Sequence, residues 1–167
     1  ALALEPGDGK TRALINFYLG HLAEQAGDLS ALSRAIDYYQ RALDENPLLY
    51  DAQYNLGTIY LNRAYLYPAD DPKILADLSR AIEQFSALIA VHPASLPTHH
   101  NRGVARYERH QGSDLADALD DFSYIIAVDA NNRRAYFHRA LTAIRAGNTR
   151  QWIPDFEKTL TLDPAYY

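Results

Sequence analysis

The sequence predicts an all-α fold, an α-solenoid in which antiparallel helix pairs stack side by side. Three observations carry this prediction: a short motif repeats along the chain, apolar residues around it recur at helical spacing, and the repeats differ in length at only one turn. One helix pair alone leaves an apolar face open to water, and the next pair covers it. We therefore expect a linear array of similar helix pairs.

The clearest repeat is the pentapeptide Leu-Ser-Arg-Ala-Ile, which spans 32–36 and recurs at 78–82. An aromatic residue follows each copy after three residues, and two further segments align on the same aromatic position. A proline, or once an alanine, follows each aromatic after eight residues. The four aromatic residues that define the repeats are Tyr39, Phe85, Phe122 and Phe156.

A small residue marks the first helix of each repeat. The distance from this residue to the aromatic of the same repeat is 19, 28, 19 and 16 residues, whereas the turn between repeats has a constant length. Insertions are thus confined to the turn inside a helix pair, which projects from one edge of a solenoid. The four small residues are Gly20, Gly57, Gly103 and Ala140.

Helical spacing is clearest in the second helix of each repeat, where apolar residues fall at i, i+3, i+6 and i+7. Two repeats show this pattern in full, with Ile36, Tyr39, Ala42 and Leu43 in one and Ile82, Phe85, Leu88 and Ile89 in the other.

The expected helix ends agree with this pattern. Asp71 and Ser113 are predicted N-caps, because their side chains can accept hydrogen bonds from the first free amides of a helix. Gly27 and Gly147 are predicted to end first helices. Pro154 removes an amide donor, so the last helix should start late or be kinked.

Residues 50–60, together with Ala81, Phe85 and Pro93, resemble a nearly complete tetratricopeptide repeat. This family repeats a unit of about 34 residues, with W-x2-L-G-x2-Y in the first helix and A-x3-F followed by Pro in the second. The resemblance covers 13–167. It implies a right-handed superhelix whose first helices line a concave groove.

The predicted organisation is one continuous repeat domain. The chain begins at Ala1 without methionine, so we expect a segment of a longer polypeptide. The insertion of 12 residues in the second repeat adds Tyr65 and Tyr67 as a second candidate contact surface, or simply lengthens the helices. The predicted boundaries are 1–12 for the end of a preceding helix plus a turn, then 13–49, 50–95, 96–132 and 133–167 for the four repeats.

Two arginines interrupt the apolar face of the first helices. Arg102 and Arg139 stand where the first two repeats have leucine, so their side chains should be partly buried and paired. In the same two repeats an aspartate precedes the second-helix aromatic. We therefore predict the ion pairs Arg102–Asp121 and Arg139–Asp155, each joining the two helices of one repeat.

The resemblance implies a protein partner, a peptide or a helix, bound along the first helices. Carried over to this sequence, the residue three before each small site faces the groove, and in all four repeats it carries an aromatic ring. Nearby asparagines would satisfy backbone groups of the ligand, and two arginines would attract its acidic end to the fourth repeat. The alternative is that the rings pack against neighbouring repeats. The predicted groove residues are Phe17, His21, Tyr54, Asn55, Thr58, His100, Asn101, Val104, Arg134, Phe137, Leu141 and Arg145.

No set of residues points to catalysis, a metal or a cofactor. Residues 9–11 read Gly-Lys-Thr, as at the end of a phosphate-binding loop, but Leu4 occupies the position of the first glycine of that loop. We expect a solvated turn there. His99 and His100 are adjacent, and neighbours on a helix point about 100° apart, so they cannot share one metal ion. The sequence also has no cysteine.

Charge and hydropathy exclude two classes of partner. The net charge of −5 works against binding of a nucleic-acid backbone, which is held by clustered lysine and arginine. No apolar run approaches the roughly 18 residues of a membrane span. The absence of cysteine fits a reducing and an oxidising compartment equally, so the compartment stays open, with the cytoplasm slightly favoured over the periplasm or the extracellular space.

The predicted function is a non-catalytic protein–protein interaction scaffold. Two alternatives stay open. The apolar face beside Phe156 and Leu160 lacks the polar capping helix of a typical array, so the chain would self-associate through this C-terminal face as a homo-oligomer. The segment would otherwise be a regulatory domain of a larger enzyme.

Overall fold

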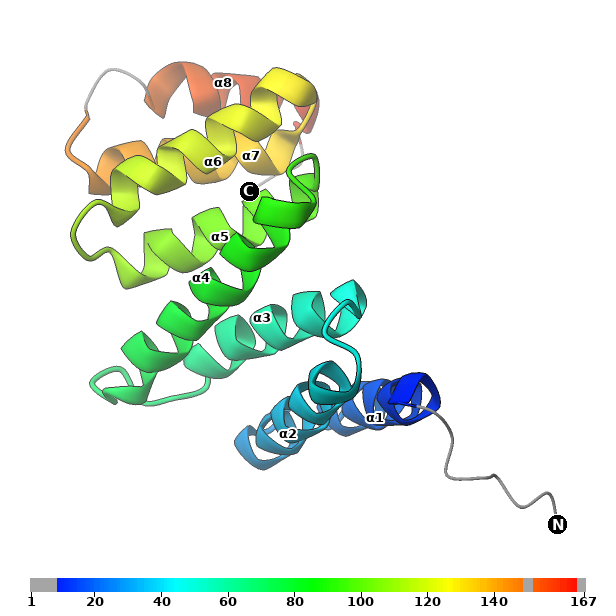
Figure 1. Cartoon of the computed structure of the whole chain (residues 1–167). Coiled ribbons are helices and arrows are strands. Elements are labelled where there is room, and N and C mark those ends of the chain that lie inside the picture. The colour runs from blue at the N-terminus through cyan, green and yellow to red at the C-terminus, as the bar shows by residue number, and fades with distance from the viewer. Residues whose placement is uncertain (1–8, 149–151, 165–167) are drawn as a thin grey trace, which may run out of the picture. The chain divides into compact units, whose positions relative to one another are not determined.

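The computed structural model describes residues 9–148 and 152–164 of the chain. All regular secondary structure in these ranges is helical, and the helices follow one another as antiparallel pairs (Figure 1). The predicted all-α fold is confirmed. The helices are α1 (Gly9–Glu24), α2 (Leu29–Glu45), α3 (Tyr50–Ala64), α4 (Lys73–Val91), α5 (Leu96–Arg109), α6 (Asp114–Val128), α7 (Arg133–Arg145) and α8 (Trp152–Leu162).

The chain divides into two compact units, Ala1–Leu88 and Ile89–Tyr167, here called the N-terminal and C-terminal units. The N-terminal unit holds the pair α1/α2 and the pair α3/α4 up to the last turn of α4, and the C-terminal unit holds the pairs α5/α6 and α7/α8. In the N-terminal unit α2 packs against both α1 and α3, and in the C-terminal unit α6 packs against both α5 and α7. Within each unit, the second helix of one pair therefore covers the first helix of the next.

In three of the helix pairs, a small residue of the first helix lies beneath an aromatic ring of the second helix. This residue is a glycine in all three, and the ring above it is fully buried. The missing side chain lets the two helices approach closely. In the fourth pair Ala140 replaces the glycine, and Phe156 is only half-buried. The three contacts, in which a Cβ atom built on the glycine would lie 2.8 Å from a ring carbon, are Gly20–Tyr39, Gly57–Phe85 and Gly103–Phe122.

Three of the expected helix signals act as the sequence suggested. Gly27 and Gly147 adopt φ angles of +71° and +74° just after α1 and α7. Glycine adopts this left-handed backbone conformation with little steric strain. At the start of α4, the backbone N–H of Lys73 donates to Asp71 Oδ1 over 2.8 Å. The two glycine conformations explain why α1 and α7 end there, and the hydrogen bond to Asp71 explains where α4 begins.

The start of α6 differs from expectation, whereas α8 starts late as expected: it begins four residues before Phe156, and α6 begins eight residues before Phe122. Ser113 precedes α6, but its hydroxyl donates to Asp117 over 3.0 Å and does not cap the backbone. Asp114 instead holds the preceding loop, because it accepts a hydrogen bond from Gln111 N. Pro154 is the third residue of α8, a first-turn position where an amide would have no acceptor within the helix. The helix therefore begins at Trp152, ahead of the proline.

The first helix begins earlier than the sequence suggested. Residues 9–12, expected to form a turn, are the first turn of α1. Arg12 ties this turn to α2, since its Nε and Nη2 donate to Glu45 over 2.9 and 2.8 Å. The glycines near this end suggested a turn, and the long-range partner of Arg12 could not be foreseen. The helix tail expected at 1–6 lies outside the described residues.

The insertion of the second repeat forms the connection from α3 to α4. Tyr65 is exposed there, whereas Tyr67 is half-buried and lies beneath Lys73, whose Nζ is 5.6 Å from the ring centre. One of the two tyrosines thus contributes to packing. Of the two rings, Tyr65 is therefore the more exposed, at 55%.

Candidate functional site

The four rings assigned to the groove occupy the same place in all four helix pairs. Each ring projects from the first helix, is half-buried, and contacts the aromatic residue of the second helix in the same pair. The rings thus brace their own helix pair and still expose part of their surface. The distances between ring centres are 5.8 Å for Phe17–Tyr39, 5.9 Å for Tyr54–Phe85, 5.9 Å for His100–Phe122 and 5.8 Å for Phe137–Phe156.

In the N-terminal unit, two of the predicted groove residues belong to a chain of polar contacts. Asn55 Nδ2 donates to the hydroxyl of Tyr39 over 3.3 Å, and that hydroxyl donates to Glu24 Oε2 over 3.1 Å. His21 Nδ1 lies 2.6 Å from the other oxygen of Glu24. Burial and the nearby carboxylate raise the pKa of Tyr39, so its hydroxyl keeps its proton and remains a donor. Of the predicted groove residues, His21 thus contacts Glu24 directly, and Asn55 is linked to it through Tyr39.

A cavity of about 310 Å³ opens beside this chain, where α1 ends and α2 and α3 pass each other. Glu24 forms one wall, and Leu32 and Ile59 give apolar surface. Asn55 and Thr58, both predicted for the groove, line the same cavity. The hydroxyl of Thr58 donates to the backbone oxygen of Tyr54 over 3.0 Å, which turns its methyl group outward from that bond.

In the C-terminal unit, the predicted groove residue His100 contacts a second histidine instead of such a polar chain. The rings of His100 and His138 are 4.8 Å apart and meet edge to face, and both contact Phe122. His100 Nε2 is buried without a hydrogen-bond partner among the described residues. Burial, with repulsion from His138 and Arg134, lowers the pKa of His100 to about 4. This ring is therefore neutral near pH 7.

The remaining predicted residues of the C-terminal unit divide between packing and exposure. Val104 packs against the cluster around Phe122 and so serves the core more than the groove. Asn101 and Leu141 are half-buried, and Arg134 is exposed. Arg134 is thus the predicted groove cation that stays open to solvent.

Arg145 is held against α5. Its guanidinium lies 3.8 Å from the centre of the Tyr107 ring, and its Nη1 donates to the backbone oxygen of Tyr107 over 2.7 Å. Glu108 is 4.0 Å from the same nitrogen. The charge of Arg145 is therefore partly compensated, which weakens the sequence argument for an acidic ligand end at the fourth repeat.

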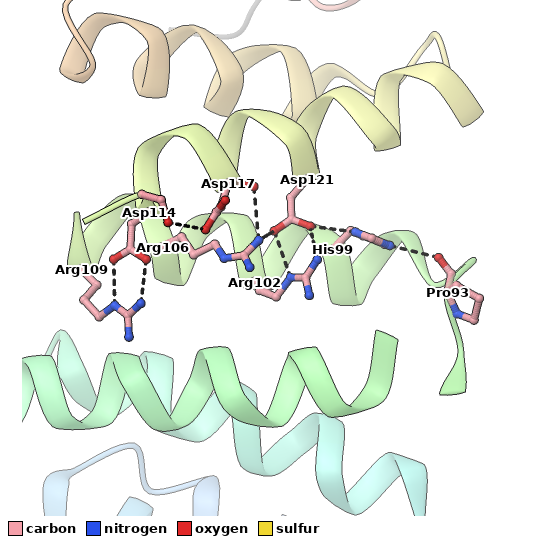
Figure 2. A network of polar contacts seen from close by, with 9 residues as sticks. Pro93, His99, Arg102, Arg106, Arg109, Asp114, Asp117 and Asp121 are labelled. Atoms are coloured by element: carbon pink, nitrogen blue, oxygen red, sulfur yellow. Dashed lines mark hydrogen bonds and ion pairs between the residues drawn. The ribbon is translucent and has the colours of Figure 1, made fainter. Parts of the chain in front are cut away.

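The structure brings together both ion pairs that the sequence suggested. Arg102 donates to Asp121 from Nε over 3.1 Å and from Nη2 over 2.7 Å, and Asp121 is buried (Figure 2). In the last pair, Arg139 Nε and Nη2 donate to Asp155 over 2.8 and 2.7 Å. Each bidentate pair joins a first helix to its second helix, which offsets the cost of burying the carboxylate.

Asp121 also has partners that the sequence reading missed. Arg106 Nη1 lies 2.6 Å from Asp121 Oδ2, and His99 Nδ1 lies 2.8 Å from Oδ1 (Figure 2). The other nitrogen of His99 is 3.0 Å from the backbone oxygen of Pro93. The missed signal was a stripe at positions 99, 102, 106 and 109, spaced for one face of a helix, opposite an acidic stripe at 114, 117 and 121.

A second type of ion pair closes the variable turn of two helix pairs. Arg63 donates to the buried Asp77 over 2.7 and 2.8 Å, and Arg109 donates to the buried Asp114 over 2.8 and 2.7 Å (Figure 2 shows the latter). Burial alone would raise the pKa of Asp114, but hydrogen bonds from Arg109 and Gln111 lower it below its usual value. Both arginines lie six residues after the glycine, and both aspartates lie eight before the aromatic. The two pairs are thus equivalent.

The described residues contain no cluster of three or more histidine, cysteine or acidic side chains that could hold a metal ion. Within the same ranges, no helix is long and apolar enough to cross a membrane. The carboxylates on the inner faces of the helix pairs are engaged by arginine, so they act in structure.

Stacked helix pairs, a glycine under an aromatic ring in three of them, and a turn of constant length between pairs define a class of helical-repeat protein. The chain has the tetratricopeptide-repeat fold.

Solved structures support this conclusion over nearly the whole chain. MamA from Desulfovibrio magneticus RS-1 matches with a TM-score of 0.77 at 17% identity, over 94% of this chain and 78% of that chain. Another MamA crystal structure matches with a TM-score of 0.75 at 20% identity, over 93% and 75% of the two chains. The thermophilic protein TTC0263 of Thermus thermophilus, a tetratricopeptide-repeat protein, has a TM-score of 0.65 at 20% identity, over 91% and 75%. No family model and no curated protein matches the sequence.

Proposed function

We propose that the chain is a non-catalytic scaffold that binds a partner protein, as an extended peptide or a helix, along the first helices of its repeats. The observation that carries this proposal is the ring that recurs at one position in all four pairs, half-buried in each. Such rings offer rigid apolar surface at little cost in side-chain entropy.

Polar groups beside the rings support the same proposal. Asn55 and Asn101 are half-buried and lie next to Tyr54 and His100 in sequence. An amide side chain can both donate to and accept from the backbone of a bound peptide. Alternating rings and amides suit an extended ligand, whose side chains and backbone groups also alternate.

The experiment compares partner recovery by the native chain and by a variant with Tyr54, Asn55 and Asn101 replaced by alanine. We expect the triple variant to lose bound protein, with its circular dichroism spectrum unchanged. The matched control replaces Tyr38, Glu83 and Gln84 on second helices by alanine, and it should retain the partner. Equal recovery by both variants would contradict the proposal.

Self-association is a second candidate function, and a specific observation favours it. The first helix exposes a row of large apolar side chains, with exposed fractions of 47% for Leu14, 65% for Tyr18 and 65% for Leu22. On α8, Leu160 is 41% exposed. Light scattering over a range of concentrations tests this function: a mass that stays at the monomer value excludes it.

A further inference from the structure

The cavity between α1, α2 and α3 has a mixed lining. Glu24 is the only ionisable side chain among the described residues that line it. Asn55, Thr58 and Asn62 add neutral polar groups, and Leu32 belongs to the apolar part of the wall. A lining of this kind matches a ligand group with an aliphatic stem and one polar end.

The charge around the cavity selects the sign of that polar end. Glu24 closes α1, so the carbonyl end of the helix dipole adds negative potential next to its carboxylate. The N-terminal end of α2, where the helix dipole is positive, is nearby, but Asp28 caps this end by accepting a hydrogen bond from Ala31 N over 2.8 Å. Both effects favour a cation.

The carboxylate of Glu24 has room for a further donor. A carboxylate offers about four lone-pair sites, and Tyr39 and His21 each lie against one oxygen. The side chain of Glu24 is 26% exposed, so a ligand can reach it from solvent. Asn55, which also lines the cavity, uses its amide nitrogen to donate to Tyr39, so its amide oxygen can accept a hydrogen bond from a ligand.

We infer that this cavity receives a basic side chain, lysine or arginine, of the partner peptide. The stem of the side chain lies against Leu32 and Ile59, and the cationic end binds Glu24 and the amide oxygen of Asn55. This inference rests on the proposed function, because it assigns one subsite of the proposed groove.

The first test uses n-butylammonium as the probe, with 1-butanol as the neutral control of equal stem length. Nitrogen–proton spectra of the native chain should show saturable shifts at the side-chain amides of Asn55 and Asn62 with n-butylammonium. The affinity should fall roughly fivefold in Glu24→Gln, the loss expected for a partly exposed ion pair. Glu83→Gln, an exposed change on α4, is the control and should bind as the native chain does.

A second variant guards against disturbance of Tyr39 by the change at Glu24. Asn62→Lys alters an exposed residue that lines the cavity and places an ammonium group beside Glu24. It should abolish the n-butylammonium shift at the side-chain amide of Asn55, which this variant keeps, while the spectrum of the fold is unchanged. Equal responses to n-butylammonium and 1-butanol, or a response unchanged in both variants, overturn the inference.

The second test selects peptides from a random library displayed on phage. The native chain and Glu83→Gln should enrich peptides with lysine or arginine, whereas Glu24→Gln should lose this preference. Peptides that are enriched without a Glu24-dependent preference overturn the subsite and leave the proposed function standing. If the Tyr54, Asn55 and Asn101 alanine variant selects the same peptides as the native chain, the groove itself fails. In that case, n-butylammonium binding at Glu24 marks a site for free amines, and the inference about a partner side chain is overturned.

Discussion

Arg102 and Asp121 form a bidentate ion pair between α5 and α6, with Arg102 Nη2 only 2.7 Å from Asp121 Oδ1. The carboxylate is 3% exposed, and Arg106 approaches its other oxygen. Two guanidinium groups therefore depend on one buried anion.

Asp121→Asn removes this anion and leaves the arginines without their common acceptor. We expect the free energy of unfolding to fall by about 3 kcal/mol, the usual loss when one partner of a buried pair is removed. Urea titration followed by circular dichroism measures it. The neighbouring Asp120 is exposed, so Asp120→Asn should change stability by less than about 0.5 kcal/mol. Similar losses in both variants would speak against the pairing.

Gly57→Ala tests the close contact between α3 and α4. The added Cβ would lie 2.8 Å from Phe85, which costs about 1–3 kcal/mol, whereas alanine gains about 1 kcal/mol of helix propensity. We expect a net loss of about 1 kcal/mol in the free energy of unfolding. In a double-mutant cycle with Phe85→Leu, the smaller side chain should relieve the overlap, so additive losses would contradict the contact.

His100 makes stability depend on pH in a defined direction. Its pKa is lowered to about 4 in the folded chain, below the value of about 6.5 for an unfolded histidine. Protons therefore bind the unfolded chain first, and stability falls as the pH decreases from about 6.5 toward 4, by up to about 3 kcal/mol. Because Nε2 has no partner among the described residues, His100→Phe should fold and should lose this part of the pH dependence.

The measurement for His100 is the difference in unfolding free energy between the native chain and the variant at about pH 7 and about pH 4.5. Carboxylates titrate in the same window, but they contribute equally to both proteins. A difference that does not change with pH would show that His100 is protonated as easily in the folded chain as in the unfolded one.

Tyr39→Phe removes the hydroxyl that links Asn55 to Glu24. We expect a loss of about 1 kcal/mol in the free energy of unfolding, the net value of such hydrogen bonds, because the ring keeps its place over Gly20. Tyr38→Phe, at the adjacent half-buried position, is the control. Thermal unfolding compares the two, and equal midpoints would contradict the prediction.

The fold could be predicted because helix-pair stacking leaves a periodic trace in the sequence. Constant spacing between Pro47 and Gly57, or Pro93 and Gly103, follows from a turn whose geometry is repeated. The pairing of Arg102 with Asp121 could also be predicted from the sequence. In the third and fourth repeats, an arginine and an aspartate together replace the apolar or neutral residues of the first two repeats.

Other parts of the site could not be predicted because they depend on long-range contacts. Asp77 lies beyond an insertion, so its alignment with Arg63 appears only when both helices are in place. His99 drew notice as the neighbour of His100, whereas its contact with Asp121 forms only when α5 packs against α6. The cavity beside Glu24 arises from three helices at once, and no single stretch of sequence describes it.

The ion pair Arg63–Asp77 has a practical consequence. It joins residues 14 positions apart, whereas the equivalent pair Arg109–Asp114 joins residues 5 apart. In both pairs, however, the arginine and the aspartate occupy the same positions relative to the glycine and the aromatic residue of their helices. Because this ion pair fixes the end of α3 against the start of α4, the length of the connection between them does not affect how the two helices pack. A protein engineer could therefore graft an epitope tag or a small reporter domain between Tyr65 and Pro72, and the repeat below should fold as before.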